Sequence, residues 1–359
     1  MKHRSLTLAL MTIAAVSVIA IPVAAQAPAR APAAQAPKPA AAPAAKAWTP
    51  PKTSWGDPDL QGIYTSDDYI GLGLNRQAQY GTRQYFTEEE IAAREKTIQT
   101  TAERDAVEFA TPGANVGQGP PNHWGERARR SPRQTSLIIE PENGQTPALT
   151  DEGRARQAMY TRQGAGTALP EDSWEGYTYY IRCITRGIAG SVLPVIYGNG
   201  TEIVQGPGYV AILQEMVHEA RIIPLDNRPY VGSNIKLYMG DSRGRWEGNT
   251  LVIETKNILG NKTGIGGNGG TTPTSAPFSE DAKFTERLTR TDKDTIQYSM
   301  RVEDPRTYTA PFTFTFPIRR EPGYQNFEYA CHEGNHGMMN QLSGARADER
   351  KAREAAGQK

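Results

Sequence analysis

Two stretches near the C-terminal end of the chain alternate strictly between apolar and polar residues. Residues 296–302 and 308–318 place apolar side chains at every second position. Because successive side chains of a strand point to opposite faces, this period of two predicts antiparallel strands with one buried and one solvated face. Shorter apolar runs at 210–213, 250–254 and 284–288 predict further strands.

Strands that follow one another at short spacing, without helices between them, predict one antiparallel sheet system. The sheet is expected to close into a barrel or to fold as a sandwich. Pro311 and Pro317 lack an amide hydrogen, so the strand at 308–318 is expected to lie at an edge of the sheet or to be kinked there. A hairpin with an Asn-Gly turn is expected over 135–150.

Helices are predicted before this sheet region. Thr87 and Glu90 have the spacing of a capping box, in which side chain and backbone satisfy each other's amide groups, ahead of a helix that ends near residue 107. Thr150 is expected to cap a second helix over 151–162. The sequence thus predicts two helices that pack against the sheet.

These elements predict a single mainly β domain over residues 48–343, whose N-terminal part, 86–163, is helical. That length is sufficient for a sizeable core. The charged, alanine-rich tail 344–359 is expected to form an exposed helix. The predicted fold is an antiparallel barrel or sandwich with two or three peripheral helices.

The N-terminal region has the pattern of an export signal. A short basic start precedes an apolar run over 6–23 and small residues, which predicts a signal peptide over 1–25. Residues 26–47 are almost all Ala, Pro and Gln, a composition with too little bulky apolar surface to fold, and this predicts a disordered spacer. A periplasmic or secreted protein is expected, without membrane insertion after the signal is removed.

The charge balance excludes one class of partner. The formal net charge is +1, and removal of the signal peptide deletes Lys2 and Arg4, which leaves 38 basic and 39 acidic residues and a net charge of −1. A nearly neutral protein lacks the basic surface that nucleic-acid binding requires. A small organic molecule is the expected partner, and the oligomeric state is left open.

The chain contains two cysteines, Cys183 and Cys331. In an oxidising compartment two cysteines favour one disulfide, and the alternative is a pair of buried thiols. The bond would hold Arg182 and Arg186 against the residues that follow Cys331. Together with Asn335, these two arginines are predicted to bind a ligand.

After an apolar, strand-like run, the chain reads His332-Glu333-x-x-His336, the pattern in which zinc proteases place two ligands on one helical face and a glutamate base between them. Gly334 is unfavourable inside a helix, costing ~1 kcal/mol relative to Ala. His218 is the candidate third ligand. A turn with Gly334 at positive φ is the favoured interpretation, so no metal site is favoured and zinc remains an alternative cofactor.

A second polar cluster follows the predicted strand at 210–213. Glu215, His218 and Arg221 combine a carboxylate, an imidazole and a guanidinium, which are the groups that general acid–base catalysis uses. The alternative is a salt-bridged strand end, in which Arg221 pairs with Glu215 or Glu219 for little net stability.

Three functional hypotheses follow. The first is a binding barrel that holds a small, partly apolar organic molecule between Tyr, Phe and Met side chains of the alternating strands. The second is an acid–base or metal-assisted hydrolase or lyase whose candidate catalytic residues are Glu215, His218, Arg221, His332 and Glu333. The third is a structural envelope protein, which predicts no cavity.

Three strings of the sequence are specific enough to suggest a family. Residues 55–62 read WGDPDLQG, residues 244–252 read GRWEGNTLV and residues 329–335 read YACHEGN. These strings resemble those of a family of exported bacterial hypothetical proteins, and the resemblance extends over most of the chain after the spacer. It implies bacterial export and an unglycosylated protein, and it carries over no activity.

Overall fold

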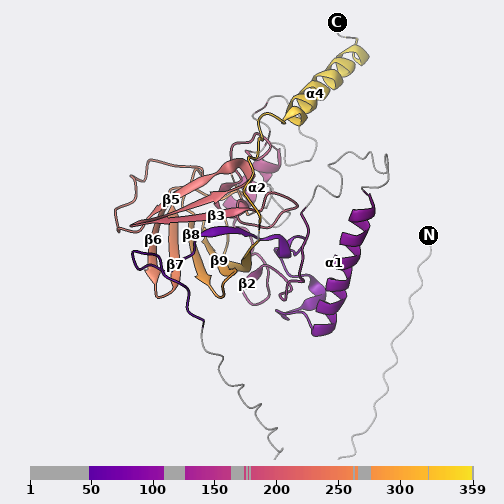
Figure 1. Cartoon of the computed structure of the whole chain (residues 1–359). Helices are drawn as coiled ribbons and strands as arrows, with labels where there is room; N and C mark the ends of the chain where they lie inside the picture. The colour runs from indigo at the N-terminus through magenta and orange to yellow at the C-terminus, as the bar shows by residue number, and fades with distance from the viewer. Residues whose placement is uncertain are drawn as a thin grey trace, which may run out of the picture. The chain divides into compact units, whose positions relative to one another are not determined.

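An antiparallel sheet of nine consecutive neighbours dominates the computed structural model and forms a nearly closed barrel (Figure 1). Their order is β5-β4-β3-β1-β10-β9-β8-β7-β6. The strands are β1 (Gly62–Thr65), β3 (Thr201–Gly206), β4 (Tyr209–Gln214), β5 (Ala220–Pro224), β6 (Asp241–Glu247), β7 (Thr250–Lys256), β8 (Lys283–Arg290), β9 (Thr295–Glu303) and β10 (Phe312–Arg320). The mainly β fold predicted from the alternation is confirmed, and of the two arrangements the structure adopts the barrel.

The structure describes residues 48–108, 126–162, 174, 177, 179–261, 263–265, 276–321 and 323–357. The predicted signal peptide, 1–25, and the predicted spacer, 26–47, lie outside these residues. One compact unit extends from Trp48 to Lys359.

The barrel closes where β5 meets β6, and a glycine makes this approach possible. A Cβ atom at Gly244 of β6 would lie 2.6 Å from Leu225 Cδ2 and 2.9 Å from Ile223 Cγ2. Real Cβ atoms do not approach other atoms so closely, so a side chain at this position would push the two edges of the sheet apart. Gly244 is therefore required for closure.

The alternating strands fill the inside of the barrel with their own side chains. Tyr298, Met300, Phe314 and Phe316 are each at most 3 % exposed, and the rings of Tyr298 and Phe316 lie 5.5 Å apart. Full burial of side chains of this size contributes about 1.5–3 kcal/mol each. In the described part of the chain, the residues that were expected to line a ligand cavity therefore pack against one another in the core.

β10 does not lie at an edge of the sheet, so the first of the two alternatives expected from its prolines is wrong. β9 pairs with it on one side, and the other side pairs with β2 (Ile138–Glu140) through 313–314 and with β1 through 319–320. Pro317 falls in the interval between these two partners. In this interval neither β1 nor β2 pairs with β10, so no strand on that side lacks a hydrogen bond because Pro317 has no amide hydrogen. This explains how β10 tolerates a proline.

The predicted hairpin over 135–150 is also wrong. Its turn forms, because Gly144 adopts φ 67° and donates its amide to Pro141 O at 2.8 Å. Only β2 becomes a strand, however, and its partner is β10 rather than the residues after the turn.

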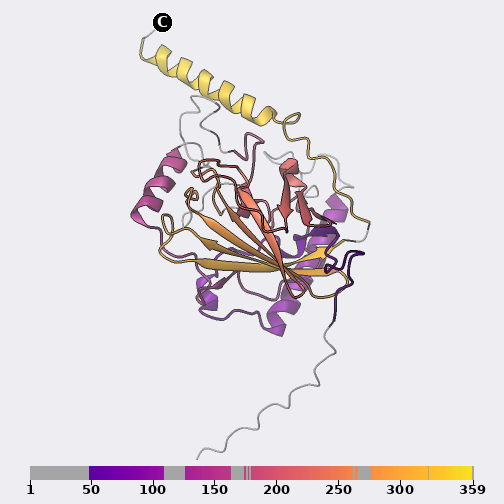
Figure 2. The same ribbon diagram turned by 90° about the vertical axis from the view of Figure 1, so that its left-hand side faces the viewer.

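Both helices predicted before the sheet are confirmed, and both lie outside the barrel (Figure 2). The capping box of α1 (Glu88–Glu108) forms, with Thr87 N donating to Glu90 Oε2 at 2.8 Å and Glu90 N to Thr87 Oγ1 at 3.3 Å. α2 (Asp151–Arg162) begins after Thr150, whose hydroxyl accepts from an amide of the first turn.

Two further helices complete the described part. The short α3 (Gly187–Gly190) is fully buried and was not predicted. α4 (His336–Ala355) begins eight residues before the predicted tail helix at 344, and none of its residues is buried. Short 3-10 turns are η1 (Asp67–Tyr69), η2 (Ala78–Tyr80) and η5 (Met216–His218). Among the described helices, none is long and apolar enough to span a membrane.

Candidate functional site

A disulfide joins the two regions that the sequence marks as candidate sites. Cys183 and Cys331 are bonded, with their Cα atoms 5.7 Å apart, which confirms the predicted pairing. Asn335 strengthens the junction, because its side-chain amide donates to Ile181 O at 2.7 Å. Asn335 thus holds two segments of the chain together.

Residues 324–331, called the crossing segment below, pass over the chain that follows β4. Tyr324 donates its hydroxyl to Glu215, and Phe327 N donates to Glu215 Oε1 at 3.2 Å. The ring nitrogen Nδ1 of His218 lies 3.3 Å from Tyr329 O. The apolar run before Cys331 is not a strand but an irregular segment held by these contacts.

Glu215 and His218 are therefore neighbours with different environments. The Glu215 carboxylate is buried and also accepts from Gly200 N at 3.2 Å, so hydrogen bonds to Gly200, Tyr324 and Phe327 occupy both of its oxygens. His218 is exposed at the surface. The carboxylate anchors the crossing segment, and no direct contact connects it to the imidazole.

Arg221, the third member of the predicted cluster, points into the barrel. Its guanidinium pairs with both carboxylate oxygens of Glu286 on β8, at 2.6 and 2.8 Å, and Tyr298 donates its hydroxyl to the same carboxylate at 2.8 Å. Pairing of Arg221 with Glu215 or Glu219 is therefore wrong. Burial raises the pKa of Tyr298 well above its usual value, so the hydroxyl stays protonated as a donor.

The His332–His336 motif does not form a zinc-protease helix. His332 and Glu333 lie in an exposed turn, and α4 begins only at His336, so the two histidines do not share a helical face. Gly334 does not adopt the expected positive φ. Among the described residues, no group of three His, Cys, Asp or Glu side chains could hold a metal ion.

A cavity of about 350 Å³, called the tyrosine pocket below, lies beside the crossing segment. Its lining consists of Ile70, Gly71, Tyr180, Pro194, Val195, Ile196, Tyr197 and Met216. Tyr329 of the crossing segment stacks on Tyr197, with their ring centres 6.2 Å apart. The walls are mostly apolar, and the phenol groups supply the polarity.

The tyrosine hydroxyls form a hydrogen-bonded group close to a buried positive charge. Burial, reinforced by the neighbouring phenols, raises the pKa of Tyr329 to about 12 and that of Tyr180 further. Arg186 is 1 % exposed, and its guanidinium carbon lies 5.8 Å from the centre of the Tyr180 ring. Burial lowers the pKa of Arg186 to about 10, so it remains charged at neutral pH.

Of the two arginines predicted to bind a ligand, Arg186 lies near Tyr180 of the tyrosine pocket, whereas Arg182 contacts other aromatic rings. The Arg182 guanidinium stacks on the rings of Trp174 and Tyr179, at 4.3 and 5.1 Å from their centres. Glu219 lies near Arg186 and accepts the hydroxyl of Thr185 at 2.6 Å. Burial raises the pKa of the Glu219 carboxyl, which favours its neutral form.

A second cavity, of about 460 Å³, adjoins Tyr324 and contains a carboxyl pair. Asp67 and Glu126 are hydrogen-bonded to each other, and the Asn199 amide donates to both at 2.9 Å. Burial, together with the hydrogen bond to Glu126, raises the pKa of Asp67 to about 7. The raised pKa keeps a proton on Asp67 below neutral pH, and this proton can be donated to Glu126.

Sequence reasoning missed both groups. A sequence pattern does mark Tyr180, because three tyrosines lie within residues 177–180, shortly before Cys183. No sequence pattern indicated the pair Asp67 and Glu126, since its members lie far apart in the chain and no local spacing connects them.

Comparison of the chain with protein-family models, with curated proteins and with solved structures finds no match. The chemistry of the tyrosine pocket and of the carboxyl pair is therefore the basis for a functional assignment.

Proposed function

We propose that this protein binds a small, partly apolar organic molecule in the tyrosine pocket. The observation that carries the proposal is a mostly apolar cavity of about 350 Å³ whose polar groups, the phenols of Tyr180 and Tyr197, converge near the buried charge of Arg186. Small-molecule sites combine an apolar lining with a few placed polar groups, and this volume falls within their usual range.

The arrangement of donors indicates which end of the ligand faces inward. Tyr180 Oη lies 3.9 Å from the sulfur of Met216, which is a weak acceptor. An oxygen of a bound molecule would be a better acceptor, and the charge of Arg186 favours one that carries negative charge. The ligand is therefore an organic acid or phenol whose apolar part contacts Ile70 and Pro194.

Export to the periplasm or the exterior is part of this proposal. The Cys183–Cys331 disulfide supports it, because such bonds persist mainly in oxidising compartments. The signal-peptide pattern at the N-terminus and the resemblance to exported bacterial proteins support it as well. The molecule bound would then come from outside the cytoplasm.

Untargeted mass spectrometry of molecules extracted from the purified protein tests the binding function. Val195→Phe fills the tyrosine pocket, and Val204→Phe adds the same volume on the outer face of β3, where Val204 is 45 % exposed. We expect an organic acid or phenol in the wild type and in Val204→Phe, and none in Val195→Phe. Equal amounts in both variants, or no such molecule in the wild type, would contradict the proposal.

The carboxyl pair favours a second function, acid–base catalysis. A carboxyl with a pKa near 7, beside a cavity, is suited to donate or accept a proton at neutral pH. In this second function, Asp67 and Glu126 take the place of the catalytic groups predicted from the sequence, Glu215, His218, His332 and Glu333. The third hypothesis, an envelope protein without cavities, loses support because the described residues enclose several.

A panel of nitrophenyl esters and glycosides tests the catalytic alternative by the release of nitrophenol. If Asp67 is the acid or base, Asp67→Asn abolishes turnover, and the exposed Asp226→Asn leaves it unchanged. Turnover that survives in Asp67→Asn would exclude this assignment.

A further inference from the structure

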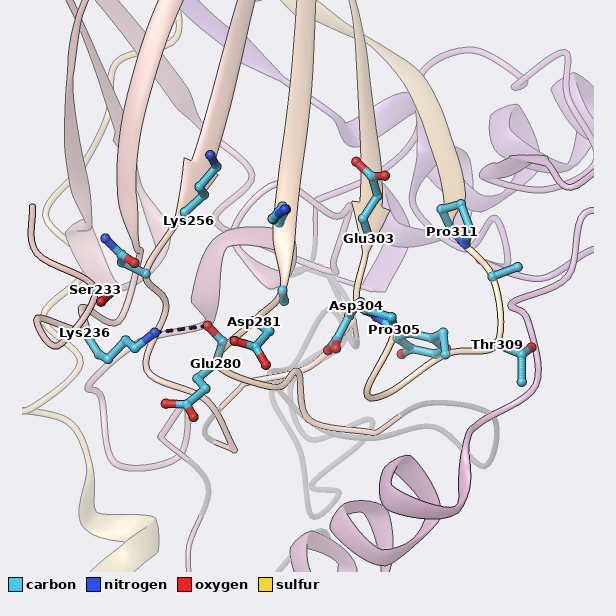
Figure 3. Close-up of a pocket in the computed structure, with 15 residues that line it drawn as sticks. Ser233, Lys236, Lys256, Glu280, Asp281, Glu303, Asp304, Pro305, Thr309 and Pro311 are labelled. Atoms are coloured by element: carbon cyan, nitrogen blue, oxygen red, sulfur yellow. Dashed lines mark hydrogen bonds between the residues drawn. The ribbon is translucent and has the colours of Figure 1, made fainter. Parts of the chain in front are cut away.

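A cavity of about 670 Å³ lies at the ends of β7 and β9 and the beginning of β8, and it shares no lining residue with the tyrosine pocket (Figure 3). We call it the mixed-charge cavity, because its lining includes the lysines Lys236, Lys256 and Lys283 and the acids Glu280, Asp281, Glu303 and Asp304. We propose that the mixed-charge cavity binds a neutral carbohydrate.

The charges that line this cavity nearly cancel. Four acids accompany three lysines, and Arg306 contacts two of the acids at 3.1 and 3.6 Å. Lys256 stands opposite Asp241 in the register of β6 and β7. Lys283 stands opposite Glu303 in the register of β8 and β9. The cavity therefore has no large excess of either charge that would select an anion or a cation.

The acids of the lining also lack the arrangement of a metal site. Asp304 is 2 % exposed, and its two oxygens accept hydrogen bonds from the hydroxyls of Ser279 and Thr307. Within the described ranges, no three His, Cys, Asp or Glu side chains converge as metal ligands would. A cation such as Ca²⁺ takes about six to eight oxygen ligands. The lining thus suits an uncharged ligand better than an ion.

Lys283 and Glu303 offer such a ligand a donor and an acceptor side by side. Residues directly opposite each other in an antiparallel pair have Cβ atoms about 5 Å apart on one face of the sheet. None of the ion pairs of the described chain joins these two side chains, and Glu303 contacts Arg301 only at 3.9 Å. A hydroxyl group can accept from an ammonium while it donates to a carboxylate. Adjacent hydroxyls of a sugar would therefore bridge Lys283 and Glu303.

Neutral polar groups extend this recognition across the cavity. Ser233, Asn257 and Thr309 belong to the lining, and hydroxyl and amide groups both donate and accept hydrogen bonds. The Asn257 amide nitrogen donates to Val231 O at 3.1 Å, which leaves the side-chain oxygen as an acceptor. Figure 3 shows Ser233 and Thr309 on opposite sides of the cavity. Hydroxyls along the whole length of a bound sugar would thus find partners.

An apolar wall completes the cavity. Pro305, Ala310 and Pro311 line it from the connection between β9 and β10, and all three are exposed. A sugar ring has hydroxyls at its rim and C–H groups on its faces, so one ligand can contact this wall and the charged groups together. The volume of about 670 Å³ falls within the usual range of small-molecule sites. A neutral carbohydrate matches the size, the polarity and the charge balance of the lining.

A printed array of neutral and acidic oligosaccharides, probed with the fluorescently labelled whole protein, tests the site. We expect retention on neutral oligosaccharides that stays constant between about 50 and 500 mM salt, because salt weakens interactions between charges. Glu303→Ala and Lys283→Ala should each lower the apparent affinity about tenfold, since each removes a hydrogen bond to a charged group. Glu354→Ala and Lys293→Ala are the matched controls, because both residues are exposed outside the cavity, and they should bind like the wild type.

Ala310→Phe tests the cavity independently of the strand pair. It places a ring in the cavity from an exposed position of the connection between β9 and β10, so it should abolish retention and leave Tm unchanged. Val195→Phe, which fills the tyrosine pocket, should leave retention on the array unchanged. This pair of variants separates the carbohydrate site from the tyrosine pocket.

Three outcomes would overturn the proposal. The first is a wild-type protein that is retained on no neutral oligosaccharide. The second is retention on acidic oligosaccharides alone that falls as salt is added, which would mark an ion site. The third is an Ala310→Phe or Glu303→Ala variant that binds the same neutral oligosaccharides as tightly as the wild type, which would place the carbohydrate elsewhere on the protein.

Discussion

Individual buried charges set the chemistry of this protein at the scale of single residues. The guanidinium of Arg186 lies close to Tyr180 of the tyrosine pocket, and that of Arg221 pairs with Glu286 inside the barrel. The guanidinium carbon of Arg186 lies 5.8 Å from the centre of the Tyr180 ring, and the charge of Arg221 is cancelled by Glu286.

The carboxyl pair predicts a specific dependence of stability on pH. The pKa of Asp67 is about 7 in the folded protein and 3.8 for an ordinary aspartate, so the folded state binds this proton more tightly. Its contribution to the free energy of unfolding is fully present below pH 3.8 and is lost as the pH rises through 7. The loss is on the order of a few kcal/mol.

Denaturant unfolding between pH 5 and 8 measures this effect. Asp67→Asn should flatten the decline with pH, because an amide donates a hydrogen bond to Glu126 without titrating. Asp226→Asn is the control, since the hydrogen bond from Arg228 lowers the pKa of Asp226 to about 2 and its titration falls outside this range. A wild-type stability that rises from pH 5 to 8 in step with that of Asp67→Asn would refute the raised pKa of Asp67.

Arg221→Ala should destabilise the fold strongly. The variant leaves the Glu286 carboxylate buried without its partner, which costs about 3–5 kcal/mol. Arg221→Met/Glu286→Leu removes both charges and should recover most of the loss. For comparison, Arg245→Ala breaks a pair whose side chains are 46 % and 39 % exposed, so its cost should stay below about 1 kcal/mol. Urea denaturation of the variants measures these losses in the free energy of unfolding. It tests whether loss of Arg221 costs more than loss of the exposed Arg245.

At the scale of elements, local patterns were predictable and long-range partners were not. The alternation over 296–302 predicted β9 because one face of that strand is buried and the other is solvated. The pairing of β2 with β10 was not predicted, since β10 lies far from β2 along the chain. Prediction of the site had the same limitation. The disulfide could be predicted from the two cysteines, but Asp67, Glu126 and Asn199 are brought together only by the folded structure.

Closure of the barrel depends on Gly244 of β6. Gly244→Val inserts atoms against Leu225 and Ile223, and overpacking of this kind costs about 1–3 kcal/mol. Gly337→Val is the control, because nothing lies within 4 Å of a Cβ atom at Gly337 in α4. The midpoint of thermal unfolding should fall clearly only for the β6 variant. An equal fall in both variants would show that contact at the β5–β6 edge does not limit stability.

At the scale of the whole molecule, the barrel is a packed scaffold, and the cavities lie around it. The disulfide closes a loop with a sequence separation of 148 and fixes the crossing segment beside the tyrosine pocket. Cys183→Ser/Cys331→Ser should therefore lower the free energy of unfolding by up to ~5 kcal/mol in the chain-entropy description. It should also weaken ligand retention and leave the far-ultraviolet circular dichroism unchanged. Unchanged stability and retention would show that the bond does not hold the site.

A crystal structure of the protein with its co-purified molecule tests the central claim most directly. The account predicts electron density in the tyrosine pocket, with an oxygen of the ligand within hydrogen-bond distance of Tyr180 and its apolar part against Ile70 and Pro194. Density among the side chains inside the barrel, or a ligand bound elsewhere while the tyrosine pocket stays empty, would contradict it.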